Sequence, residues 1–105
     1  ENEFHHIVLH RRDLGDFVSP IANRPYSTVE DELACAQPYR EKFLRTINSF
    51  TLKELDEVDI IRKDKNQHRK LGDYLLRIAY HESVHTGQLL SYLRTMELVR
   101  PNIWD

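Results

Sequence analysis

The chain has 105 residues, of which 40% are apolar and 30% charged, and its formal charge is −2. This length and composition predict one domain over residues 1–105 with its own hydrophobic core, and they exclude a disordered chain and a low-complexity repeat. The charge balance argues against a nucleic-acid partner and no apolar run is long enough for a membrane helix, so a cytoplasmic protein without nucleic-acid or membrane partners is expected.

The first segment has apolar residues at helical spacing, at Phe4, Ile7, Leu14 and Val18. This pattern predicts a long helix that ends at Pro20, because proline breaks a helix interior. This helical pattern is present from the first residues of the chain, which begins at Glu1 rather than at a methionine. We therefore expect that a preceding helix is missing from the chain.

The middle third begins with a capping-box pattern, in which Ser27 is followed three residues later by Glu30. This pattern predicts a helix that starts at Thr28. Apolar residues continue at helical spacing as far as Phe50, and Pro38 within this stretch is expected to bend the helix.

A second capping box, formed by Thr51 and Glu54, predicts one short helical turn over Leu52–Glu57. Residues 62–70 include no apolar side chain and are expected to form an exposed connection. Neither an alternation of β-branched residues nor an Asn-Gly or Asp-Gly turn is found, so no strand is predicted and the expected fold class is all-α.

The last third carries a heptad seam over residues 71–96 and is expected to end before Pro101. All seam positions are apolar or aromatic except Glu82 and His85, and buried polar groups need partners. Three long helices with short links predict an incomplete up-down bundle. A missing fourth helix, or a second copy of the chain in a homodimer, would cover the remaining apolar faces.

His81 and His85 are four residues apart on this predicted helix, so both imidazoles project from the same side and are able to bind one divalent ion. Residues 81–85 also match the HExxH pattern of metalloproteases, which require a third metal ligand. The only later glutamate is Glu97, about 18 Å further along the helix, which excludes this class. The third ligand is therefore expected upstream.

The upstream candidates are His5, His6 and His10. On a helical wheel centred on the predicted apolar face, His10 lies about 60° from the centre, His6 about 100° and His5 about 160°. This geometry favours His10, and the alternative is a solvated border with incidental histidines. His68, in the charged connection, is expected to be exposed and uninvolved.

Residues 70–105 closely resemble the final helix of the DinB-like family, whose pattern has two histidines separated by three residues, then Gly-Gln, Tyr-Leu-Arg and a closing proline. The matching residues are His81, His85, Gly87, Gln88, Tyr92, Leu93, Arg94 and Pro101. Residues 28–58 are similar to the family's preceding helix and short capped turn. Two departures are residues 11–12, which are arginines where relatives often carry acidic or aromatic residues, and residues 97–98, which replace the usual glycine.

This resemblance implies a four-helix bundle that binds a divalent ion, zinc or nickel, through three histidines, with an open position for water or a thiol. It implies a metal-dependent hydrolase or thiol S-transferase that acts on a small-molecule substrate, such as a low-molecular-weight thiol. It also places the third ligand at His6, and His10 remains the alternative. The expected site residues are the metal ligands His6, His81 and His85 and the catalytic residues Glu82 and Gln88.

The competing hypothesis is a non-catalytic helical dimer, in which the histidines hold a structural metal or hydrogen bond within the seam. A structural site has four protein ligands, whereas a catalytic site leaves one position to water.

Overall fold

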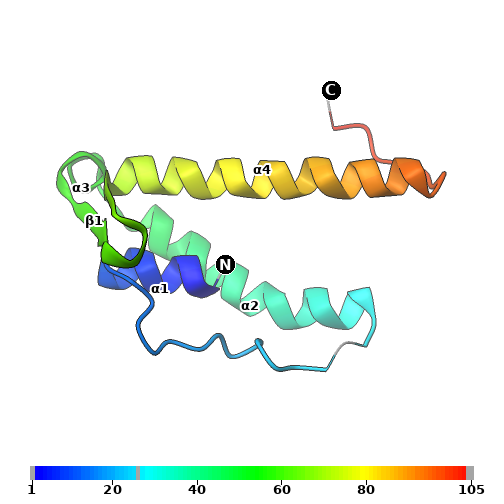
Figure 1. Ribbon diagram of the computed structural model, residues 1–105, viewed down its shortest axis with the longest axis horizontal. Coiled ribbons are helices and arrows are strands. Elements are labelled where there is room, and N and C mark those ends of the chain that lie inside the picture. Colours follow the sequence, from blue (N-terminus) through cyan, green and yellow to red (C-terminus); the bar gives the residue numbers. More distant parts are fainter. Residues whose placement is uncertain (1, 26, 104–105) are drawn as a thin grey trace. The chain divides into compact units, whose positions relative to one another are not determined.

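The computed structural model describes residues 2–25 and 27–103, and its chain divides into two compact units, Glu1–Tyr74 and Leu75–Asp105 (Figure 1). The elements in chain order are α1 (Asn2–His10), α2 (Val29–Asn48), α3 (Leu52–Glu57), β1 (Asp59–Arg62), η1 (Lys63–Lys65), β2 (Gln67–Lys70) and α4 (Leu71–Thr95). The protein is therefore mostly helical. The last helix begins in the first unit and makes up most of the second.

The first helix is shorter than the sequence pattern predicts. α1 ends at His10, and Arg11 follows with a left-handed backbone at φ 59° and donates its N–H to the carbonyl oxygen of Ile7 at 2.7 Å. The predicted continuation to Val18 is wrong, because residues 11–18 form turns and irregular backbone, with Gly15 at φ 57°.

Tertiary contacts hold this irregular segment in place of helical hydrogen bonds. The Asp13 carboxylate accepts hydrogen bonds from the backbone N–H groups of Lys63 and Asp64, at 3.1 and 3.2 Å. The carbonyl oxygen of Arg11 accepts the N–H of Ile61 at 3.1 Å. These partners lie about 50 residues away in sequence. The spacing of apolar residues in the first segment therefore does not predict these hydrogen bonds.

α2 begins one residue later than predicted, and its N-cap is Thr28. The Thr28 hydroxyl oxygen accepts the N–H of Asp31 at 3.2 Å, and the Ser27 hydroxyl donates to the Asp31 carboxylate at 2.8 Å. The predicted box of Ser27 with Glu30 is therefore shifted by one residue to Thr28 with Asp31. Pro38 lies inside the helix, as expected.

α3 has the bounds that its capping box predicts. The Thr51 hydroxyl oxygen accepts the N–H of Glu54 at 3.2 Å, and the Glu54 carboxylate accepts the N–H of Thr51 at 2.8 Å. Two backbone N–H groups without helical partners are satisfied by adjacent side chains, so the local sequence is enough to define this helix.

A two-stranded antiparallel sheet follows, where the sequence predicts an exposed connection and no strand. β1 and β2 pair with Asp59 opposite Lys70 and Arg62 opposite Gln67. Asn66 closes the turn with a left-handed backbone at φ 49°, which asparagine tolerates better than most residues, so the reversal needs no glycine. The expectation of a strand-free chain is therefore wrong, although helices dominate.

α4 covers the predicted seam, and the chain leaves the helix before Pro101. Glu97 adopts a left-handed backbone at φ 58°, and Leu98 donates its N–H to the carbonyl oxygen of Leu93 at 2.9 Å. This is the hydrogen-bond pattern of a Schellman cap, in which glycine usually occupies the left-handed position. None of the described helices is long and apolar enough to cross a lipid bilayer.

The core of the first unit collects side chains from α1, α2, β1 and the first turn of α4. Its buried apolar residues are Ile7, Val8, Phe43, Ile60, Leu71 and Tyr74. Burying each large apolar side chain contributes roughly 1.5–3 kcal/mol, so these long-range contacts stabilise the first unit.

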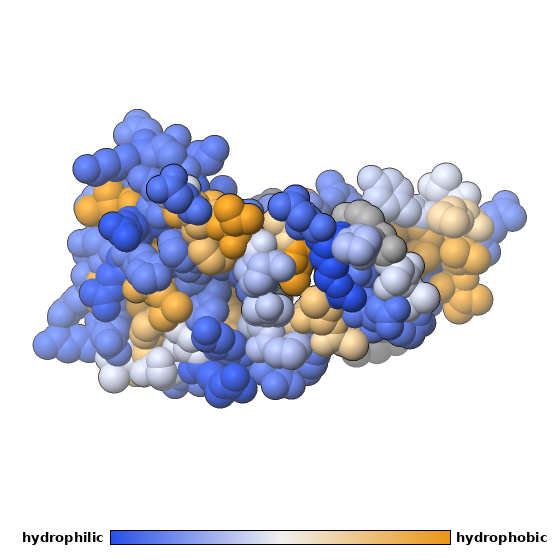
Figure 2. Space-filling model, turned by 90° about the horizontal axis from the view of Figure 1, so that it is seen from below, coloured by the Kyte–Doolittle hydropathy of each residue, from blue (hydrophilic) through white to orange (hydrophobic). Residues whose placement is uncertain are grey.

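The second half of the α4 seam differs from this core, because its large apolar side chains are exposed. Leu89 retains 58% of its accessible surface, and Tyr92 and Met96 each retain 66%. Apolar surface also gathers at the C-terminal end of α4, on the right of Figure 2, where Leu98 and Val99 are exposed.

Candidate functional site

Two histidine side chains meet on α4. The Nε2 atoms of His81 and His85 are 3.0 Å apart, and the ring centroids are 4.5 Å apart with nearly perpendicular planes. Four residues advance a continuous helix by about one turn, which brings both rings to the same side as the sequence predicts. Both side chains are exposed, so the burial that the seam implies for His85 is not observed.

Gln88 determines which nitrogen of His85 faces its neighbour. His85 Nδ1 lies 2.9 Å from Gln88 Oε1, and because an amide oxygen only accepts hydrogen bonds, this contact suits the tautomer with the proton on Nδ1. In that tautomer the Nε2 atom of His85 has a lone pair, and the Nε2 atom of His81 lies 3.0 Å from it. Metal-ligating histidines commonly donate the other ring N–H to an oxygen in this way.

The spacing of the two Nε2 atoms fits a shared metal ion. With metal–nitrogen bonds of about 2.0–2.1 Å, tetrahedral or octahedral angles require the nitrogens to be roughly 2.9–3.4 Å apart. The separation of 3.0 Å between His81 and His85 lies within this range. The pair therefore places two imidazole nitrogens at a separation that suits one metal ion.

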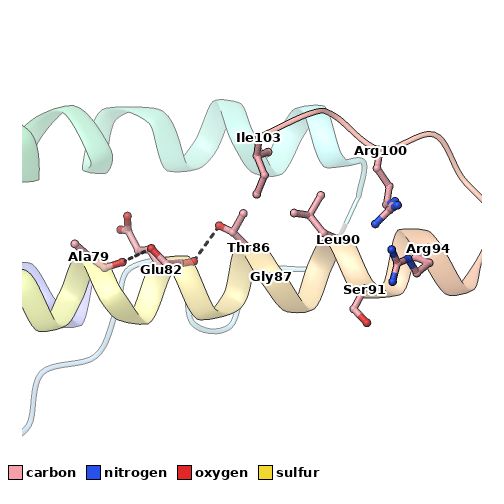
Figure 3. Close-up of a pocket in the computed structure, with 10 residues that line it drawn as sticks. Ala79, Glu82, Thr86, Gly87, Leu90, Ser91, Arg94, Arg100 and Ile103 are labelled. Carbon is pink, nitrogen blue, oxygen red and sulfur yellow. Dashed lines mark hydrogen bonds between the residues drawn. The ribbon is translucent and has the colours of Figure 1, made fainter. Parts of the chain in front are cut away.

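Glu82 lies beside this pair, displaced around the helix axis by about 100° from His81 and by about 60° from His85. Successive residues of a helix are separated by about 100° around its axis. The half-buried Glu82 lines a cavity of about 800 Å³ along α4, and its backbone carbonyl accepts the Thr86 hydroxyl at 3.0 Å (Figure 3).

His5 occupies the buried side of α1, which reverses the order of exposure that the helical wheel predicts. Only 7% of its surface is accessible, its Nε2 lies 2.8 Å from the Thr46 hydroxyl oxygen, and its ring lies 5.5 Å from that of Phe43. Burial, followed by the positive charge of Lys42, lowers the pKa of His5. The wheel fails because Leu14 and Val18, which set its centre, are not part of the helix.

His6 and His10 form a second pair at helical spacing. Their ring centroids are 4.3 Å apart, and the His6 ring also stacks on Phe17 at 4.3 Å and 26°. His6 is half-buried and His10 exposed, and His6 lines a pocket of about 510 Å³ with Asp13 and other residues of the following loop. Burial, His10 and the charge of Arg12 lower the pKa of His6, which favours the neutral imidazole that metals bind.

His68 is exposed, as expected, but it lies on a strand and has a partner. Its Nε2 is 2.9 Å from Asp59 Oδ1, and Lys70 Nζ is also 2.9 Å from that oxygen. Hydrogen bonds from Lys70 and then His68 lower the pKa of Asp59. These contacts connect the two strands across the sheet.

Four of the five candidate histidines thus fall into two pairs, His6 with His10 in the first unit and His81 with His85 in the second, whereas His5 is buried against α2. Neither unit by itself brings together three or more His, Cys, Asp or Glu side chains able to hold a metal, among the residues that the structure describes. The three-histidine site therefore stays a prediction.

Sequence reasoning missed the basic end of the cavity beside α4. Arg94 and Arg100 both line it, together with Leu90 and Ile103 (Figure 3). Arg94 was notable only as part of a family pattern and Arg100 only as the residue before Pro101. Residue 100 lies beside the helix because the chain reverses after Thr95, and the spacing of residues in the sequence does not predict this reversal.

Comparisons with protein-family models, with curated proteins and with solved structures found no match for this chain.

Proposed function

We propose that this protein binds a divalent metal ion through His81 and His85, with His6 as the third ligand and His10 as its alternative. The observation that carries the proposal is the 3.0 Å separation of two Nε2 atoms, one of them on a ring that Gln88 orients through Nδ1. Zinc or nickel is the expected ion, because neutral imidazole suits both.

The proposed activity is that of a metal-dependent hydrolase or thiol S-transferase on an up-down helical bundle, as the resemblance to the DinB-like family implies. When bound, the ion would act as a Lewis acid on a water molecule or a low-molecular-weight thiol. Gln88 keeps the proton of His85 on Nδ1, and Glu82 is the carboxylate expected to accept a proton from the substrate.

Metal titration of single variants tests the proposal. Zinc and nickel binding to the whole chain is measured by calorimetry for the wild type and for His81→Ala and His85→Ala. Loss of one of three imidazole ligands is expected to weaken binding by about 100-fold or more, because each ligand contributes a direct bond.

His68→Ala is the matched control, since it removes an exposed histidine that belongs to the sheet rather than to α4. This variant is expected to leave the metal affinity of the pair unchanged. Stoichiometric binding that survives both α4 substitutions but is lost in His68→Ala would overturn the proposal.

The same titration separates the two candidates for the third ligand. His6→Ala is expected to weaken binding by about 100-fold, whereas His10→Ala is expected to change it little. The reverse result would assign the ligand to His10. If neither substitution changes the affinity, the three-histidine set is wrong and the α4 pair binds metal without α1.

A non-catalytic homodimer is the second candidate, and the exposed seam favours it. Leu89, Tyr92 and Met96 together present apolar side chains on one side of α4, a kind of surface that often mediates association. Light scattering after gel filtration tests for the dimer. A metal-loaded crystal structure with four protein ligands would support a structural site, whereas three imidazoles and one water would support catalysis.

A further inference from the structure

The cavity beside α4 lies entirely within the second unit. The left-handed backbone of Glu97 turns the chain out of the helix, and the extended residues that follow return alongside it. Leu90 on the helix and Ile103 on the returning segment line the same cavity, of about 800 Å³ (Figure 3). This volume lies within the range of small-molecule sites, roughly 300–1,000 Å³.

One end of this cavity is strongly basic. Arg94 comes from the last turn of α4 and Arg100 from the returning segment, and Figure 3 shows both guanidinium groups turned toward the same end of the cavity. Among the described residues, neither guanidinium forms a salt bridge that would neutralise it. Two like charges at one site repel each other, and an anion between them relieves this repulsion.

The walls next to the two arginines offer complementary contacts. Leu90 is half-buried and Ile103 faces it, so an apolar group of a ligand finds two aliphatic side chains. Guanidinium groups match the planar geometry of a carboxylate particularly well.

We propose that this cavity is a binding site for a small organic carboxylate with an apolar body. The carboxylate lies between Arg94 and Arg100, and the apolar body lies against Leu90 and Ile103. The carboxylate position is distinct from the two proposed metal ligands on α4, because Leu90 is displaced from His81 by about 180° and from His85 by about 140° around the helix axis, although Glu82 lines another part of the same cavity. The proposal therefore does not depend on metal binding.

A titration of the full-length chain with hexanoate tests the site, followed through amide chemical shifts by NMR. Saturable one-to-one binding is expected, with the largest shifts at residues 90–103. Arg94→Gln and Arg100→Gln are each expected to weaken binding about ten-fold, since each removes a charge-assisted contact to the carboxylate. Hexanol, which has the same chain and no charge, is expected to bind more weakly than hexanoate by a similar factor.

Arg77→Gln is the matched control, because it removes the same charge from an exposed position of α4 outside the cavity. It is expected to bind hexanoate as the wild type does. Ile103→Ser tests the apolar wall without changing any charge, and should weaken hexanoate binding while leaving acetate binding unchanged. Equal losses in Arg77→Gln and Arg94→Gln, or equal affinities for hexanoate and hexanol, would overturn the proposal.

Discussion

α1 and α4 each carry two histidines at a spacing of four residues, and the two pairs differ in what surrounds them. On α4 the Nε2 atoms of His81 and His85 face each other, and Gln88 holds the outer nitrogen of His85. On α1 the rings of His6 and His10 are equally close, but His6 stacks on Phe17. The comparison teaches that helical spacing brings rings together, whereas neighbouring side chains decide which atoms they present.

The largest effect on stability is expected at His5, because this buried histidine distinguishes α1 from α4, where both histidines are exposed. His5→Ala removes a buried ring that contacts Phe43 and lies within hydrogen-bond distance of Thr46. We expect the free energy of unfolding to fall by about 2–4 kcal/mol, measured by urea denaturation.

His10→Ala, which changes an exposed residue of the same helix, is the control and should shift the unfolding free energy by less than about 0.5 kcal/mol. If the two variants lose the same stability, then the contrast between the buried and exposed sides of α1 is wrong.

The next effect concerns the oxygen atom that orients His85. Gln88→Leu keeps the size of the side chain but removes the acceptor for Nδ1. Removing such a partner is expected to weaken zinc binding by about 10–100-fold, while His81 and His85 remain in place. Calorimetric titration measures the change, and Gln37→Leu is a control that alters a glutamine of α2 whose amide donates to Glu41. An unchanged affinity in Gln88→Leu would show that the α4 pair needs no orienting group.

The pH dependence of stability is a smaller effect that arises on α1. Burial holds the folded-state pKa of His5 below its ordinary value of 6.5. The unfolded chain therefore binds more protons between the folded-state pKa and 6.5, so the stabilising contribution is complete above pH 6.5 and is lost as the pH falls toward the folded-state value.

We expect the unfolding free energy to decrease as the pH is lowered from about 7.5 to about 5. His5→Gln places an amide near Thr46 without a titrating group, and it should make this decrease smaller. The pKa of His6 is also lowered, so His6 is expected to cause part of the decrease that remains in His5→Gln. A decrease that is as steep in His5→Gln as in the wild type would contradict the assignment.

The smallest effects are expected at the ends of the two helices. Arg11 and Glu97 both adopt left-handed backbones, at φ 59° and φ 58°. Replacing either residue by glycine relieves about 1 kcal/mol of backbone strain, part of which is offset by the greater freedom of the unfolded chain. Arg11→Gly and Glu97→Gly should therefore each raise the unfolding free energy by a few tenths of a kcal/mol to about 1 kcal/mol. Replacement by alanine, as a control, should give no such gain.

The sequence alone was sufficient where an element depends on its immediate neighbours. Thr51 and Glu54 satisfy each other's backbone groups, so α3 has the predicted bounds. The heptad pattern over residues 71–96 likewise gave α4 and the meeting of His81 with His85, because both follow from the helical repeat.

Tertiary structure decided the features whose partners are distant in sequence. α1 ends at His10 while Asp13 binds the turn between the strands, and the polar strand β2 is ordered by pairing with β1 rather than by a pattern of its own. The burial of His5 and the approach of Arg100 to α4 depend in the same way on chain reversals. Periodicity reports local backbone geometry, whereas these features depend on contacts that only the folded chain brings together.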